Sequence, residues 1–292
     1  MNSEVSAALT AEKLDPDAVE QIVRRALDED LGGPDGIDVT SVATIPAEQS
    51  DVGDLVARED GVVAGLAVAA LVFESVGRTR VEFKATDGAR VSRGDVLATV
   101  PGPTRALLTA ERTALNLLSR MSGIATHTRR WADALEGTGA TVLDTRKTTP
   151  GLRILEKYAV RAGGGTNKRM GLYDVAMIKD NHVLAAGSIT AAYQRVRAAF
   201  PDVAVQVEVE SVAQAIEAVD AGATFLLCDN MSPSLLREVV VAVDGRAELE
   251  ATGGLTLDVA RAYGETGVDY LSVGGLTHSS PILDIALDLR HR

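Results

Sequence analysis

The sequence has 292 residues, of which 46% are hydrophobic and only 3% aromatic, and its formal net charge is −12. A chain of this length and composition is expected to form one large globular domain or two unequal ones, with a core of aliphatic side chains. The negative charge argues against nucleic acid and anionic membranes as partners, because their phosphates would be repelled.

The chain before residue 104 mixes helical and strand-like patterns. Apolar residues at helical spacing predict a helix over residues 15–31, which Gly32 and Gly33 end. We expect short strands within 38–46 and 51–65, a helix over 67–76, and a β-meander over 81–103, where glycines punctuate alternating apolar residues. This part therefore predicts a mixed unit of helices and strands. Residues 1–15 show no secretory signal and no apolar run is long enough to span a bilayer, so we expect a cytoplasmic protein.

The later part of the chain has a different rhythm. A long helical pattern over 109–135 is followed by short apolar runs at 141–144, 175–178, 204–209, 224–228, 247–250 and 270–273. We expect the helix to break near Ser122 and Gly123. Helical patterns separate most of the later runs, at about twenty-residue spacing, which is typical of parallel strand–helix units.

Each of these apolar runs ends on polar residues or glycines. They are Thr145-Arg146-Lys147, Lys179-Asp180-Asn181, Glu208 and Glu210, Asp229-Asn230, Thr252-Gly253-Gly254, and Gly274-Gly275. In a parallel barrel all the strand ends open on one face, where active sites lie, whereas an open doubly wound sheet collects ligand groups at a switch point. The pattern therefore favours a barrel with a site at its carboxyl-terminal face.

The segment 142–183 carries eight Arg and Lys residues against four acidic ones, +4 within a chain of −12. Such a local concentration of cations indicates a pocket for a small anion. A dicarboxylate needs at least two fixed cations, and the two late glycine pairs are suited to a phosphate. For Arg153 and Lys157, four residues apart, we expect solvated positions on a helix.

The carboxylates at the strand ends leave several chemistries open. Alternation places Glu208 and Glu210 on one side of their strand, with Asp229 on the next. These groups could hold Mg²⁺, bind ribose hydroxyls or stabilise a cationic transition state, and a simple ion pair with the basic segment is compatible with all three. The single cysteine, Cys228, is expected to be a buried, unreactive residue.

At these motifs the chain resembles the quinolinate phosphoribosyltransferase family. The likeness is carried by ERTALNLLSRMSGIAT, LDTRKTTPGLR, IKDNHV, VEVE, LCDNMSP, EATGGL and SVGGLTHSSPILDIALD, and it covers nearly the whole chain. The resemblance implies an α/β fold: an N-terminal α/β sandwich over 1–116, an incomplete parallel α/β barrel of six or seven strands over 117–276, and a C-terminal helix over 277–292 that packs back on the first domain. It also implies transfer of a phosphoribosyl group from 5-phosphoribosyl-1-pyrophosphate to quinolinate with decarboxylation, which gives nicotinate mononucleotide, pyrophosphate and CO₂ in NAD synthesis.

The resemblance assigns roles position by position. It implies that quinolinate is bound by Arg112, Arg146, Lys168, Arg169 and Lys179. It implies that Lys147, Glu208 and Asp229 are catalytic and bind phosphoribosyl pyrophosphate together with Thr252, Gly253, Gly274 and His278. Glu208 and Asp229 are the expected ligands of Mg²⁺, directly or through water. Arg112 is expected to come from the other subunit of a homodimer, which could assemble further. Many family members have histidine where this chain has Lys168, so this residue is expected to act through its charge.

Alternative functions are a related phosphoribosyltransferase that acts on nicotinate or another ring without decarboxylation, and a carrier module of the biotinyl or lipoyl type. The glycine-punctuated meander near Gly88 suggests the carrier, but Lys84 does not stand at a hairpin tip. Release of CO₂ and a covalent cofactor would distinguish the three.

Overall fold

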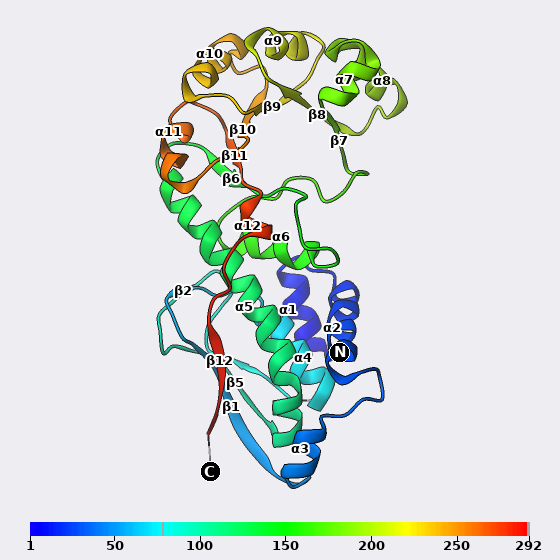
Figure 1. Ribbon diagram of the computed structural model, residues 1–292, viewed down its shortest axis with the longest axis vertical. Coiled ribbons are helices and arrows are strands. Elements are labelled where there is room, and N and C mark those ends of the chain that lie inside the picture. The colour runs from blue at the N-terminus through cyan, green and yellow to red at the C-terminus, as the bar shows by residue number, and fades with distance from the viewer. Residues whose placement is uncertain (78, 291–292) are drawn as a thin grey trace. The chain divides into compact units, whose positions relative to one another are not determined.

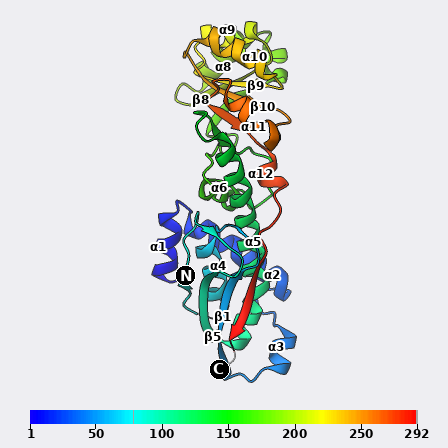
Figure 2. The same cartoon turned by 90° about the vertical axis from the view of Figure 1, so that its left-hand side faces the viewer.

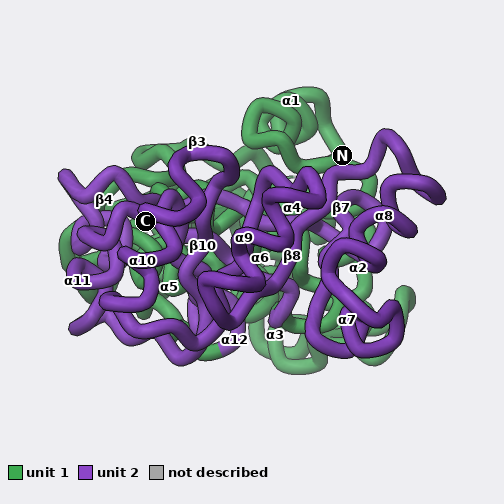
Figure 3. Tube along the Cα trace, turned by 90° about the horizontal axis from the view of Figure 1, so that it is seen from above, with its two compact units in different colours: residues 1–129, 148–164, 279–292 green, residues 130–147, 165–278 purple. Residues whose placement is uncertain are grey.

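The computed structural model describes residues 1–77 and 79–290 of the chain. The chain forms two compact units, coloured separately in Figure 3. Unit 1 comprises residues 1–129, 148–164 and 279–292, and unit 2 comprises residues 130–147 and 165–278. The expected boundary between residues 116 and 117 falls inside an uninterrupted helix, α5 (Thr104–Leu135).

Unit 1 is built on an antiparallel sheet with the strand order β12-β1-β5-β3. These strands are β1 (Ser50–Ala57), β3 (Glu82–Phe83), β5 (Val96–Pro103) and β12 (Ile285–Arg290), and a separate small ladder pairs β2 (Gly61–Val62) with β4 (Arg90–Val91). Its remaining helices are α1 (Ser3–Ala11), α2 (Pro16–Leu31), α3 (Val39–Thr44), α4 (Leu66–Gly77) and α6 (Arg153–Ala162). The apolar helix α4 packs on β5, and α1 and α2 pack on α4. The predicted helices over 15–31 and 67–76 are confirmed. The predicted meander over 81–103 is wrong, because β3 pairs with β5 whereas β4, between them in the chain, pairs with β2.

The C-terminal segment was expected to be a helix and is instead a strand. Residues Ile285–Arg290 form β12, which pairs antiparallel with β1 from Val52↔Arg290 to Ala57↔Ile285. Figure 2 shows β12, in red, alongside β1 within unit 1. The alternation of Ile285, Leu287 and Leu289 suits a strand, and the open edge of β1 supplies its hydrogen-bond partners.

Two other predictions in unit 1 are wrong, the first for a local reason and the second because of tertiary packing. Residues 39–44 form helix α3 rather than a strand, because the Asp38 side chain accepts hydrogen bonds from the backbone N–H groups of Thr40 and Ser41 and caps the helix. Helix α5 does not break at Gly123. A Cβ at Gly123 would lie 2.0 Å from the backbone oxygen of Pro281, so this glycine permits close packing.

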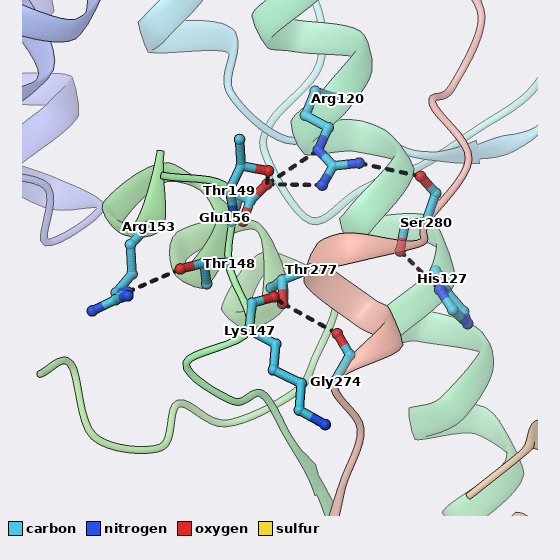
Figure 4. Close-up of polar contacts among 10 residues, drawn as sticks. All are labelled: Arg120, His127, Lys147, Thr148, Thr149, Arg153, Glu156, Gly274, Thr277 and Ser280. Carbon is cyan, nitrogen blue, oxygen red and sulfur yellow. Dashed lines mark hydrogen bonds and ion pairs between the residues drawn. The ribbon is translucent and has the colours of Figure 1, made fainter. Parts of the chain in front are cut away.

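Lys157 of α6 is fully buried, with 0% of its surface exposed, and the expectation of a solvated position is wrong. Its neighbour Glu156 is also buried, and the carboxylate accepts hydrogen bonds from Arg120 and Thr149. Figure 4 shows Arg120 reaching from α5 to Glu156 and to the backbone oxygen of Ser280. Because two of its successive ionisable residues are inside, α6 is part of the core of unit 1.

Unit 2 contains a six-stranded parallel sheet with the order β6-β11-β10-β9-β8-β7. The strands are β6 (Thr141–Leu143), β7 (Val175–Ile178), β8 (Ala204–Val209), β9 (Phe225–Asp229), β10 (Glu248–Thr252) and β11 (Tyr270–Ser272), in agreement with the predicted runs. The edge strands β6 and β7 do not pair with each other in the part of the chain that the structure describes, so the barrel is incomplete.

Helices follow the strands of unit 2 as the sequence pattern predicts. They are α7 (Asp180–Ala186), α8 (Ile189–Ala199), α9 (Val212–Asp220), α10 (Pro233–Val243), the 3-10 turn η1 (Leu257–Val259), α11 (Ala260–Gly264) and α12 (Gly275–His278). Figure 1 shows α8, α9 and α10 along one side of the sheet. Ser188, Ser211 and Ser232 cap α8, α9 and α10, since each hydroxyl accepts a hydrogen bond from the backbone N–H three residues on.

Alternation along the strands separates an apolar face from a polar one. On β8, Val205, Val207 and Val209 are buried while Gln206 and Glu208 are half-buried. The valines face the same way as buried Cys228 of β9, because Val209 and Cys228 are register partners. Burial raises the pKa of the Cys228 thiol to about 12, which confirms the predicted unreactive residue. The opposite face of the sheet carries the polar side chains.

Candidate functional site

The polar residues predicted at the strand ends of unit 2 lie at one edge of its sheet. All six strands are parallel, so their carboxyl ends meet at the same edge. The residues that the structure brings to this edge are Arg146 and Lys147 after β6, Lys179 after β7, Glu208 on β8, Asp229 on β9, Thr252 and Gly253 on and after β10, and Gly274 after β11. This is the single face that the sequence pattern predicts for a barrel site.

Strand register aligns the carboxylates on that face. Glu208 is opposite Leu227, Leu227 is opposite Glu250, and Asp229 is opposite Thr252. Side chains in register on parallel strands point to the same face. Glu208 and Asp229 therefore project from neighbouring strands on the polar face, whereas Glu210 lies beyond the end of β8 and is exposed.

Two arginines from different segments lie close together. Arg169 has a lowered pKa because it is partly desolvated and, next in weight, because Arg146 places a second positive charge nearby. The Arg169 guanidinium is also anchored, since it donates a 2.9 Å hydrogen bond to the backbone oxygen of Val175. Holding like charges together costs energy in the free protein, and an anion bound between them recovers it. Such a pair of cations is suited to a carboxylate or a phosphate.

Lys179 and Glu208 form an ion pair at this edge, with 2.5 Å between Nζ and Oε2. The Lys179 side chain is 45% exposed, so solvent weakens the pairing and a ligand can compete for the ammonium group. The backbone N–H of Lys179 donates to Nδ1 of His182, which fixes the start of α7. Lys179 is thus held at the strand end with its charge accessible.

A cavity of about 420 Å³ lies beside these cations. Arg169, Lys179 and His182 line part of it, and the remaining lining is mostly apolar and comes from β7, α7 and α8. A concave apolar wall with a few cations is the usual composition of a small-molecule site.

Lys168 occupies a more buried position than its neighbours. Its Nζ lies 2.5 Å from Oε1 of Glu250, and the side chains are 7% and 0% exposed. Glu250 was not among the predicted site residues. The alternation of Glu250 and Thr252 along β10 is the signal that could have identified it, because it places the carboxylate on the polar face.

The turn after β11 places Lys147 against a glycine. A Cβ on Gly274 would lie 2.9 Å from Cδ of Lys147 and 3.3 Å from Nε2 of His278, so a side chain here would displace Lys147 from its present position. The Thr277 hydroxyl donates a 2.9 Å hydrogen bond to the backbone oxygen of Lys147, which ties the segment after β6 to α12, and Figure 4 shows the two residues side by side. Lys147, Gly274 and His278, predicted separately from the sequence, are therefore neighbours.

The turn after β10 is packed equally closely against the turn after β9. Gly253 has φ +101°, and a Cβ there would lie 2.2 Å from Oδ1 of Asn230. The Asn230 backbone N–H donates to the oxygen of Thr252, and its side chain donates a 2.8 Å hydrogen bond to Asp229. These contacts fix the Asp229 carboxylate beside the glycine turn.

One predicted site residue, Arg112, lies apart from the others in the chain's division into units. Arg112 is exposed on α5 in unit 1, whereas every other predicted site residue belongs to unit 2.

Among the described residues there is no group of three or more His, Cys, Asp or Glu side chains that could hold a metal ion by itself. No helix among them is both long and apolar enough to cross a membrane.

Comparison with known proteins relates both parts of the chain to one family. Residues 38–122 match "Quinolinate phosphoribosyl transferase, N-terminal domain", and residues 124–288 match "Quinolinate phosphoribosyl transferase, C-terminal domain". The nicotinate-nucleotide pyrophosphorylase [carboxylating] of Mycobacterium leprae is 50% identical over 279 residues, which is 94% of this chain and 98% of the relative. Quinolinate phosphoribosyltransferase [decarboxylating] 1 of Nicotiana glauca is 41% identical and covers 92% of this chain and 81% of its own length.

Solved structures show the same similarity. The crystal structure of NadC from Streptococcus pyogenes superposes with a TM-score of 0.91 at 38% identity, covering 96% of this chain and 99% of its own.

Proposed function

Because this chain belongs to the quinolinate phosphoribosyltransferase family, we propose that it transfers a phosphoribosyl group from 5-phosphoribosyl-1-pyrophosphate to quinolinate with loss of CO₂. The products are nicotinate mononucleotide, pyrophosphate and CO₂. The observation that carries the proposal is the closeness of Arg146 to Arg169, together with the contact of Lys147 with Gly274 at the carboxyl-terminal edge of the sheet. Paired cations suit a ring dicarboxylate, and the lysine beside a glycine turn suits phosphate.

The charges on this edge fit the course of the reaction. As pyrophosphate leaves C1 of the ribose, positive charge develops on the sugar and negative charge on the leaving group. Glu208 and Asp229 stabilise the sugar cation, and Lys147 neutralises the pyrophosphate. The ring nitrogen of quinolinate supplies the electron pair for the new bond to C1 and becomes cationic. When the adjacent carboxylate leaves as CO₂, the electrons of the broken C–C bond stay on the ring carbon, which then takes up a proton.

Mg²⁺ is the metal ion that we propose for this reaction. Glu208 and Asp229 are carboxylates on neighbouring strands but form no metal site with a third ligand of their own among the described residues. That arrangement fits Mg²⁺, which commonly uses one or two carboxylates, waters and substrate phosphates. Bound Mg²⁺ would supply charge neutralisation to the pyrophosphate.

We also propose that the working unit is a homodimer in which Arg112 of one subunit completes the quinolinate site of the other. Arg112 is exposed on α5 and thus accessible to a second copy. Further assembly and a cytoplasmic location remain predictions. Mixing an Arg112→Ala variant with a Lys147→Ala variant tests the arrangement: shared sites restore activity in mixed dimers, whereas self-contained sites leave the mixture inactive.

The reaction itself is tested by incubating the protein with phosphoribosyl pyrophosphate, Mg²⁺ and quinolinate and measuring nicotinate mononucleotide and CO₂. Nicotinate serves as the control substrate, because it has one carboxylate and releases no CO₂. Turnover of nicotinate in place of quinolinate would contradict the proposal and favour the related phosphoribosyltransferase activity. A covalent biotin or lipoyl group would favour the carrier.

A further inference from the structure

The ion pair between Lys168 and Glu250 lies inside unit 2 and has no role in the proposal above beyond the charge of the lysine. The Lys168 side chain is 7% exposed and the Glu250 side chain 0%, and 2.5 Å separates Nζ from Oε1. Removing two charges from water costs several kcal/mol per ion, and apolar residues of similar size often stabilise a fold equally well. Stabilisation of the fold alone is therefore a weak explanation for this ion pair.

The direction of the Lys168 side chain is set by the end of β6. Asp144, which is fully buried, accepts a 2.8 Å hydrogen bond from the backbone N–H of Lys168 and a 2.6 Å hydrogen bond from the Asn167 side chain. Thr166 pairs in parallel with Leu143, the last residue of β6, at a single position. The loop that carries Lys168 is thus fastened at several points.

Several charged residues of the candidate site act on the pair. Burial lowers the pKa of Lys168, Glu250 raises it again, and the nearby charges of Lys179 and Arg169 lower it further. For Glu250, burial raises the pKa, the charge and hydrogen bond of Lys168 lower it, and the negative charge of Glu208 raises it. Without Glu250, the burial and the neighbouring cations would favour the neutral form of Lys168.

The Glu250 carboxylate has a second neighbour on β11. The Ser272 hydroxyl lowers the pKa of Glu250 through a side-chain hydrogen bond and so favours the charged form of the carboxylate. Lys168 and Ser272 thus both stabilise the negative charge of this buried group.

Lys168 lies near two cations that the function proposed above assigns to quinolinate, Arg169 and Lys179. A ring dicarboxylate carries two negative charges, so it is attracted more strongly to a protonated Lys168 than to a neutral one. We infer that Glu250 is a positioning residue that keeps Lys168 protonated and holds its ammonium group beside Arg169 and Lys179 to receive the dicarboxylate. The inference rests on quinolinate being the ligand, as proposed above.

The test is a double-variant cycle in the full-length protein, with quinolinate binding measured by calorimetry and stability by thermal unfolding. Glu250→Gln removes the charge and keeps the shape. It is expected to weaken quinolinate binding about tenfold, the effect of losing one charge-assisted contact. The loss should grow as the pH rises from 7 to 9, because Lys168 without its carboxylate partner deprotonates at lower pH than in the wild type. The control Glu248→Gln, two residues earlier on β10 and exposed, should bind like the wild type.

The double variant Lys168→Gln/Glu250→Gln separates positioning from scaffolding. It leaves no unpaired buried charge, so its melting temperature should recover relative to Glu250→Gln, while its quinolinate affinity stays low. Wild-type affinity in the double variant, or wild-type affinity and pH dependence in Glu250→Gln, would overturn the inference. Failure of the wild-type protein to bind quinolinate would instead overturn the proposed function and with it the ligand assigned to this pair, even if thermal unfolding still showed coupling between the two residues.

Discussion

The turn after β10 offers a sharp prediction because two adjacent glycines in it differ in their surroundings. A Cβ at Gly253 would lie 2.2 Å from Oδ1 and 3.0 Å from the backbone nitrogen of Asn230, at φ +101°. A Cβ at Gly254 would meet nothing within 4 Å, at φ +60°. Gly253→Ala therefore combines backbone strain with a collision, whereas Gly254→Ala imposes strain alone and is the matched control.

The magnitudes follow from these contacts. A non-glycine residue at a sparsely populated positive φ costs about 1–3 kcal/mol. At Gly253 the Asn230 side chain must also move away and break its hydrogen bond to the Asp229 carboxylate, which adds about 1.5–3 kcal/mol. Gly253→Ala is thus expected to lower stability by about 2.5–6 kcal/mol, and Gly254→Ala by about 1–2 kcal/mol.

Urea unfolding of both variants measures the difference, and calorimetry with phosphoribosyl pyrophosphate measures the site. Gly253→Ala should also weaken binding of this substrate, since the displaced Asn230 releases Asp229, whereas Gly254→Ala should change binding less. Equal destabilisation by the two substitutions would refute the reasoning from close packing.

The remaining predictions concern the anion site, the metal and unit 1. Arg146→Ala should weaken quinolinate binding by at least tenfold, because it removes one of two adjacent guanidinium groups; unchanged affinity and turnover would disprove its role. Removal of Mg²⁺ with a chelator should abolish turnover but leave quinolinate binding detectable by calorimetry, and full activity in the chelator would exclude the metal. Gly123→Ala, which would favour an exposed helix by about 1 kcal/mol, should instead lower the melting temperature, because its Cβ would lie 2.0 Å from the Pro281 oxygen. The hydrogen bond from Arg290 holds the pKa of Asp54 below its ordinary value, so this contribution to stability is present above about pH 4 and is lost as the pH falls through the lowered pKa. Arg290→Ala should therefore destabilise the protein near neutral pH and lose its effect in acid, as urea midpoints across that range would show.

The sequence-based errors have a common physical origin. The strand β12 was expected as a helix, but its hydrogen-bond partners lie on β1, more than two hundred residues earlier in the chain. Gly123 was expected to break a helix, because nothing in the neighbouring sequence explains a glycine at that position. The glycine is needed because the segment at residue 281 packs against this point of the helix. Lys157 was expected in solvent because a lysine on a short helix usually is there.

The local pattern of the sequence was sufficient to predict the six parallel strands and the polar residues at their carboxyl ends. Strand alternation, serine caps and the position of polar residues after apolar runs act over a few residues and can be seen in the chain itself. The tertiary structure alone decided which of these groups meet: that the charge of Arg146 acts on Arg169, that Lys147 lies against Gly274, and that Lys168 is buried with Glu250. Electrostatic interaction depends on distance and burial, and both are fixed only when segments far apart in the sequence fold together.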